Sequence, residues 1–130
     1  MAIRATAITT LFQVYDMQKS VAWYRDVLGF TVLQAYEPDG HLYWALLKLG
    51  GTQLMLNAKY EDEERPEQPP PTMGHDDVTL YIDCTDVDEA FAVLRTSDLQ
   101  LEPPQTTHYG MKQLTVVDPD GFQVCFQQPA

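Results

Sequence analysis

The stretch VYDMQKSVAWYRDVLGF, from Val14 to Phe30, joins the end of an apolar strand to a helix. Asp16 is the expected N-cap of this helix, because its side-chain oxygen can accept a hydrogen bond from a free backbone N–H of the first turn. Gly29 is the expected stop, because glycine readily adopts the left-handed conformation that follows many helices. One side of the helix carries an apolar stripe, which predicts its burial: Val21, Tyr24, Val27 and Leu28.

Alternating apolar residues on either side of this helix predict strands in both halves of the chain. In the first half, strands are expected at 7–16, 30–37, 41–50 and 52–57. In the second half, a strand at 77–84 precedes a helix at 86–97, which Thr85 or Asp86 can cap, and strands at 99–102, 111–118 and 122–128 follow. Each half therefore has the order strand, helix and three strands. Such repeats bury the hydrophobic face of each unit by packing against the other.

The length of 130 residues is that of a single domain. Within it we expect a first module at 1–58, an acidic, proline-rich linker at 59–75 and a second module at 76–130. The linker lacks hydrophobic periodicity, which is typical of a solvated connector. The alternative interpretation is a flap over a site, since long loops in compact domains are often functional.

The formal net charge is −11, and such acidity repels phosphate backbones and anionic membranes. We therefore expect neither nucleic acid nor a membrane as a partner. No apolar run approaches the ~20 residues that span a bilayer, and the first residues lack the apolar core of a signal peptide. The cysteines, Cys84 and Cys125, have no metal-ligand spacing, so free thiols in the cytoplasm are the simplest expectation.

Strand periodicity separates an apolar face from a semi-polar face in each half. The apolar faces, expected to carry the helices, include Ile8, Phe12 and Val14 in the first strand and Val78, Leu80 and Ile82 in the fifth. The other faces are rich in amides and hydroxyls. Two curved sheets with these faces inward would enclose a polar cleft; a solvent-exposed sheet face is the alternative. The expected fold class is α+β, with paired βαβββ modules forming a curved mixed sheet around a cleft.

Three stretches of this sequence resemble the vicinal oxygen chelate superfamily, which includes glyoxalases, extradiol dioxygenases and bleomycin-resistance proteins. They are VYDMQKSVAWYRDVLGF at 14–30, LYIDCTDVDEAF at 80–91 and YGMKQLTVVDPDGFQVCF at 109–126. The resemblance implies the glyoxalase/bleomycin-resistance fold over nearly the whole chain outside the linker. It implies no single activity, because this fold hosts many chemistries.

Metal-using members of that superfamily place four ligands in the cleft, usually histidine, glutamate or glutamine. Carried over by the resemblance, these positions fall on Thr9, Met55, Asp77 and Cys125. Hydroxyl and thioether groups are poor ligands for a hard or borderline divalent ion. We therefore expect no metal and no cofactor. A rebuilt site from His75, Asp77 and Cys125 stays open as an alternative.

Cys125 has three interpretations: a small packing residue, a residual ligand and a reactive thiol in the cleft. Trp44 would either stack on a flat ligand or fill the core. Gln13 stands where glutathione-using relatives often hold an arginine, so the resemblance implies that an anion clamp is missing.

The leading hypothesis is a homodimeric protein that binds a small neutral or cationic organic molecule in a metal-free cleft. The expected lining residues are Thr9, Gln13, Trp44, Met55, Asn57, Asp77, Thr79, Gln113 and Cys125. One alternative is a metal-dependent lyase, isomerase or dioxygenase with a rearranged ligand set. Another is an interaction module whose cleft is vestigial.

Overall fold

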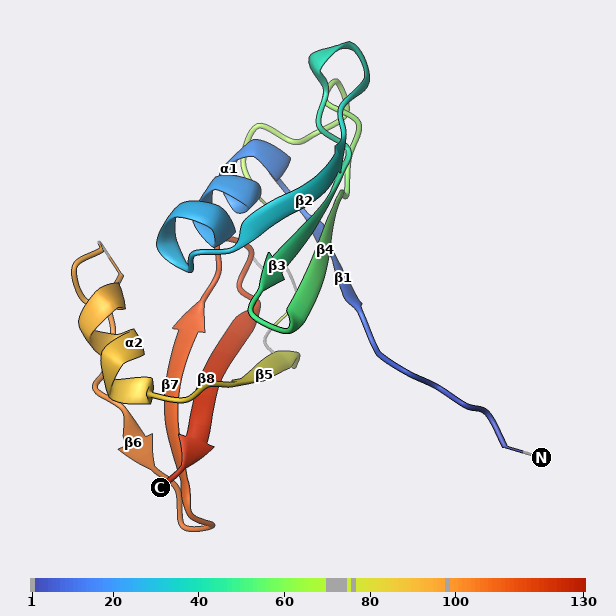
Figure 1. The fold of residues 1–130 in the computed structure, drawn as a ribbon. Coiled ribbons are helices and arrows are strands. Elements are labelled where there is room, and N and C mark those ends of the chain that lie inside the picture. The colour runs from blue at the N-terminus through green and yellow to red at the C-terminus, as the bar shows by residue number, and fades with distance from the viewer. Residues whose placement is uncertain (1, 70–74, 76, 98) are drawn as a thin grey trace.

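Two βαβββ modules follow one another in the computed structural model, which describes residues 2–69, 75, 77–97 and 99–130 (Figure 1). The first contains β1 (Thr10–Val14), α1 (Met17–Ala22) continued by a π-helix (Trp23–Val27), β2 (Thr31–Tyr36), a 3-10 turn (Pro38–Gly40), β3 (Trp44–Leu49) and β4 (Thr52–Ala58). The second contains β5 (Thr79–Asp83), α2 (Val87–Leu94), β6 (Gln105–Thr106), β7 (Met111–Val117) and β8 (Gln123–Pro129). None of the described helices is long and apolar enough to cross a membrane.

Both helices begin at the aspartates that the sequence indicates. Asp16 accepts a hydrogen bond from the backbone N–H of Lys19 at 3.1 Å, and Asp86 accepts one from that of Glu89 at 3.0 Å. Such side-chain caps satisfy backbone donors that have no partner within a helix. After the first helix, Gly29 has a φ of +86°, the left-handed conformation expected of a helix stop.

Each module forms its own four-stranded mixed sheet. The strand order is β1-β4-β3-β2 in the first and β5-β8-β7-β6 in the second. The first strand of each module runs parallel to the last, as the pairs Phe12–Leu56 and Ile82–Phe126 show. Figure 1 shows α1 beside the first sheet and α2 beside the second, on the same side of the molecule. This arrangement is the paired βαβββ fold that the sequence predicts.

The apolar faces of both sheets form one core with the helices. Its fully buried members include Val14, Leu54 and Leu56 from the first sheet and Leu114, Val116 and Val124 from the second. From the helices, Val21, Tyr24, Leu28, Val87 and Leu94 join it. The alternation therefore places the helix-covered faces as expected, because burying apolar area is the main driving force of folding.

The expectations for the first strand and for residue 78 are wrong in part. The strand begins at Thr10 instead of 7, and the preceding residues run away from the body of the molecule (Figure 1). Ile8, expected on the core face, is 91% exposed, and Val78 is exposed as well. The alternation of side chains along a strand assigns each residue to one face of the sheet. Burial in the core also requires that a neighbouring element cover that residue.

The expected strand at 99–102 is also wrong. Its residues form no strand, and β6 lies at Gln105–Thr106, after two prolines. Gln105 pairs with Gln113 and Thr106 with Lys112 in β7. Leu99 and Leu101 instead pack against the core, which explains an alternating pattern without a strand.

The described part of the linker folds back onto the first module. Arg65 lies 3.5 Å from the carboxylate of Asp16, and its guanidinium lies 5.3 Å from the ring centre of Tyr15. The hydroxyl of Tyr43 donates to Glu61 at 2.9 Å. Residues 61–69 are nevertheless exposed.

Candidate functional site

Each sheet has an open face, the side turned away from the helices. On the first sheet, strand pairing aligns Gln13, Asn57, Trp44 and Tyr36 in one cross-strand row. The adjacent row contains Leu11, Met55, Leu46 and Gln34. Trp44, Met55 and Asn57 are half-buried and Gln13 is exposed. This face therefore presents amides beside aromatic and apolar side chains, a combination suited to binding organic molecules.

The open face of the second sheet carries a ladder of amide hydrogen bonds. Gln113 donates to the hydroxyl of Tyr109 at 3.0 Å and to the side-chain oxygen of Gln127 at 3.2 Å. Gln127 in turn donates to Asp83 at 3.1 Å. Thr79 donates to Gln123 at 3.0 Å on the same face. These bonds hold the amides in fixed orientations, which lowers the ordering cost of polar recognition.

Cys125 lies in the middle of β8, between Tyr81 and Thr115 on the neighbouring strands. Only 2% of its surface is exposed. Burial raises the pKa of its thiol, although a hydrogen bond with Thr115 acts in the opposite direction. The thiolate is the nucleophilic and metal-binding form, so these surroundings favour an inert packing residue.

Only two of the four positions that correspond to metal ligands lie in strands, and these two strands belong to different sheets. Thr9 is exposed in the extended segment before β1, and Met55 lies in β4. Asp77 is exposed in the turn before β5, and Cys125 is buried in β8. A hydroxyl, a thioether and a protonated thiol do not fit a divalent ion. The donor set therefore does not fit the metal of metal-using members.

His75 is not gathered with Asp77 and Cys125 into a rebuilt metal site. Its ring stacks on Phe122 at 3.8 Å between centres. Its Nε2 atom is buried without a hydrogen-bond partner among the described residues. Within the same part of the chain, no three His, Cys, Asp or Glu side chains form a group that could hold a metal ion.

The structure brings the nine expected lining residues together only in part. Thr9, Gln13, Trp44, Met55 and Asn57 belong to the first module, whereas Asp77, Thr79, Gln113 and Cys125 belong to the second. Gln13, Asn57 and Trp44 are direct cross-strand neighbours. None of the nine lines the cavities at the module junction or beside the linker that the described residues form.

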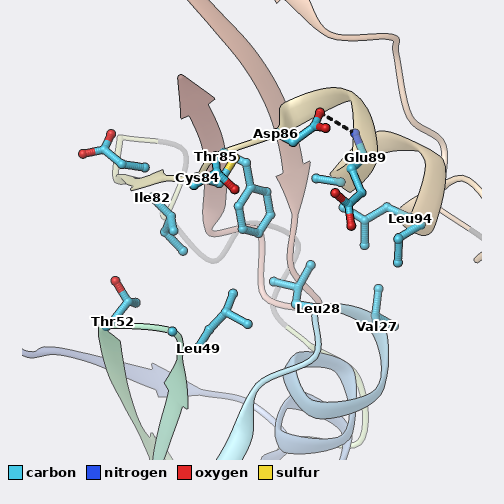
Figure 2. A pocket seen from close by; sticks show the side chains of 16 residues that line it. Val27, Leu28, Leu49, Thr52, Ile82, Cys84, Thr85, Asp86, Glu89 and Leu94 are labelled. Carbon is cyan, nitrogen blue, oxygen red and sulfur yellow. Dashed lines mark hydrogen bonds between the residues drawn. The ribbon is translucent and has the colours of Figure 1, made fainter. Parts of the chain in front are cut away.

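The larger cavity, of about 450 Å³, lies between the modules (Figure 2). Its walls come from the end of the first helix, the β3–β4 turn, the end of β5 and α2. Labelled members include Leu28, Leu49, Ile82 and Leu94 on the apolar walls and Asp86 and Glu89 on the acidic rim. Sequence reasoning missed these residues because it searched the strand faces. The Gly50–Gly51 turn, which adds no side chain to the junction, was the available signal.

Comparison with known proteins identifies the group to which this fold belongs. Residues 7–126 match the model of the Glyoxalase/Bleomycin resistance protein/Dioxygenase superfamily. The chain belongs to this superfamily. A search of curated proteins gives no match.

Several solved structures share the fold at low sequence identity. TioX from Micromonospora sp. ML1 is 24% identical with a TM-score of 0.76, covering 97% of this chain and 100% of its own. TnmS3 from Streptomyces sp. CB03234, described as an antibiotic binding protein, is 23% identical with a TM-score of 0.74, covering 99% and 100%. The bleomycin resistance determinant encoded on transposon Tn5 is 18% identical with a TM-score of 0.73, covering 96% and 98%.

Proposed function

We propose that this protein binds a small neutral or cationic organic molecule, without a metal, against the open faces of its sheets. The observation that carries the proposal is the row of Gln13, Asn57, Trp44 and Tyr36. The core does not use this row, and Tyr36 is 60% exposed. Aromatic rings with amides beside them provide stacking area and oriented hydrogen bonds for an organic ligand.

The side chains at the metal-ligand positions support a metal-free site, and the net charge of the chain supports a ligand that is not an anion. Thr9 and Met55 occupy two of the four metal-ligand positions implied by the resemblance, and neither side chain suits a divalent ion. A net charge of −11 favours the approach of cations over anions. TnmS3, whose fold is similar, is described as an antibiotic binding protein, which agrees with a sequestering role for this chain.

A homodimer is part of this proposal. β1 and β5 are edge strands, and exposed edges are commonly covered by a partner. The extended N-terminal segment also exposes Ile3 and Ile8, which makes it a candidate for contact with a second copy. Because each open face belongs to a different sheet, a cleft closed by two copies would combine them. Light scattering at micromolar concentration tests the dimer, and a monomer mass would refute it.

The binding proposal is tested by thermal unfolding with a panel of aromatic antibiotics, including bleomycin, with and without EDTA. A ligand at 100 times its Kd stabilises the fold by about 2.7 kcal/mol, which shifts the Tm measurably. We expect a shift in Tm that EDTA leaves unchanged. Trp44→Ala should weaken the affinity for the ligand by tenfold or more. Tyr60→Ala, which removes a ring from the loop after β4, is the control. About one bound metal per chain, by elemental analysis, would contradict the metal-free proposal.

A further inference from the structure

The internal repeat relates two junctions between the modules. Asp86, the N-cap of α2, follows Asp16, the N-cap of α1, by 70 residues. At this offset Ala90 corresponds to Ser20 and Leu94 to Tyr24, while the Gly50–Gly51 turn corresponds to the end of the Asp118–Gly121 turn. We call the contact between the β7–β8 turn and the first helix the packed junction. The region where the β3–β4 turn faces α2 across the cavity is the open junction.

The packed junction is filled by side chains that the open junction lacks. Tyr24 donates to Asp118 at 2.7 Å, and Ser20 donates to Asp120 at 3.2 Å, all of them buried. At the open junction, alanine and leucine replace Ser20 and Tyr24. Lys48 and Gly50 stand at the positions of Asp118 and Asp120. A Cβ atom added at Gly50 or Gly51 would meet no atom within 4 Å. The cavity of about 450 Å³ occupies this unfilled place.

The cavity has apolar walls and an acidic rim. Val27, Leu28, Leu49, Ile82, Leu94 and Phe126 supply the apolar area, whereas Asp83, Asp86 and Glu89 supply carboxylates. No lysine or arginine occurs among the described lining residues. Asp86 caps α2 and Asp83 accepts from Gln127, but the carboxylate of Glu89 bonds to none of the described residues. Figure 2 shows the Glu89 side chain extending from α2 toward the helix end that carries Leu28.

We propose that the open junction is a second ligand site, distinct from the Trp44 row on the first sheet, for a monovalent organic cation with an apolar body. The volume falls within the range of about 300–1,000 Å³ typical of small-molecule sites. Apolar walls select a hydrophobic body, and three carboxylates with no compensating base select positive charge. Asp83 and Asp86 are already committed within the fold, so Glu89 is the carboxylate that meets the cation.

The first experiment compares tetraphenylphosphonium with tetraphenylborate, which have nearly the same shape and opposite charge. Calorimetric titration of the full chain should show that the phosphonium binds at least tenfold more tightly. Added salt should weaken its binding, because partly exposed charge pairs are screened. Equal affinities for the two ions would overturn the proposal.

The second experiment locates the cation. Glu89→Gln keeps the shape of the side chain and should weaken phosphonium binding about fivefold, the size expected for one partly exposed charge pair. Asp88→Asn is the matched control, since it removes one charge from the same helix turn, from a residue that does not line the cavity, and should change affinity less than twofold. Trp44→Ala should leave this binding unchanged even if it abolishes binding at the open faces. Equal effects of the two α2 variants, or loss of binding in Trp44→Ala, would refute a separate site.

The third experiment uses Cys84, which lines the cavity and is half-buried, whereas Cys125 is buried elsewhere. Burial raises the pKa of the Cys84 thiol, so alkylation with iodoacetamide is followed at mildly alkaline pH and mapped by mass spectrometry. Tetraphenylphosphonium should slow alkylation of Cys84 several-fold. An unprotected Cys84 would overturn the proposal, as would a Cys84 that is unreactive in the free protein because a second copy covers the cavity.

Discussion

At the packed junction the β7–β8 turn buries two carboxylates against the first helix, whereas at the open junction the β3–β4 turn presents two glycines to α2. The buried carboxylates are fully engaged. Asp118 accepts from Tyr24 and from the backbone N–H groups of Asp120 and Phe122, at 2.7, 2.9 and 2.9 Å. Asp120 accepts from Ser20 and from the backbone N–H of Tyr15, at 3.2 and 3.0 Å.

The comparison shows that the two equivalent junctions of a repeated fold can have different roles, one structural and one in ligand binding. Burying a carboxylate is unfavourable unless donors surround it, and here donors from both modules do so. Such a network depends on geometry, so it restricts how one module sits on the other. Among the described residues, the open junction has no such network of buried carboxylates, and the cavity there leaves space for a ligand. Variants at corresponding positions test whether this division is real.

The largest expected effect is that of Phe122→Ala at the packed junction. Phe122 is buried between Phe12 and His75, with ring centres 3.7 and 3.8 Å away. Removing a buried phenyl ring should lower the free energy of unfolding by about 4 kcal/mol, measured by urea denaturation. Thr52→Ala, at the corresponding position of the open junction, should cost less than about 1 kcal/mol. Equal losses would erase the distinction between the junctions.

Tyr24→Phe should have the next largest effect. Burial raises the pKa of Tyr24, and the charge of Asp118 adds to this, so the phenol stays protonated and donates its hydrogen bond. Without the hydroxyl, Asp118 loses a donor in a buried site, which should cost about 2 kcal/mol by urea denaturation. Tyr43→Phe, whose hydroxyl bonds to the exposed Glu61, should cost less than about 0.5 kcal/mol.

A smaller effect should appear in the pH dependence of stability. Burial is the main cause that raises the pKa of Asp118 above its ordinary value, although its hydrogen bonds oppose the shift. The folded state therefore binds this proton more tightly than the unfolded state. Its contribution is greatest below the unfolded pKa of about 4 and is lost as the pH rises through the folded pKa. The wild type minus Asp118→Asn difference in unfolding free energy should fall from pH 4 toward pH 7; a rise would contradict the pKa direction.

Ala90→Leu should produce the smallest change in stability. Ala90 lines the cavity, so a leucine side chain at this position can fill part of it. Leucine, like alanine, is a good helix former, so the helix should tolerate the change. Filling a cavity commonly raises the free energy of unfolding by about 0.5–1 kcal/mol. The same variant should abolish tetraphenylphosphonium binding at the open junction. Unchanged binding with raised stability would show that the cation lies elsewhere.

Local sequence signals were sufficient for most of the fold. Asp16 and Gly29 mark the limits of the first helical segment, because capping involves only residues within one turn. The alternation of β4 and β8 assigned the core side correctly, since neighbouring residues on a strand must point to opposite faces. Signals of this kind failed at 99–102, where leucines pack on the core without strand pairing.

The candidate site was predictable as residue types and strand faces, but not as an assembled cleft. Gln13, Asn57 and Trp44 are neighbours because strand register follows from alternation and turn length. Whether the faces of the two sheets meet depends on how whole modules pack against one another. No short pattern encodes that packing.

The sequence by itself determined the two modules, the starts of both helices and the polar character of their open faces, but it placed the end of α2 at 97 instead of Leu94. Only the tertiary structure decided that one acidic turn is buried and that the corresponding glycine turn leaves a cavity. The bonds that bury Asp118 and Asp120 against the first helix join residues 94 to 105 positions apart. Their formation depends on the mutual orientation of the modules, which is set by the packing of the whole core and by no local preference of the chain.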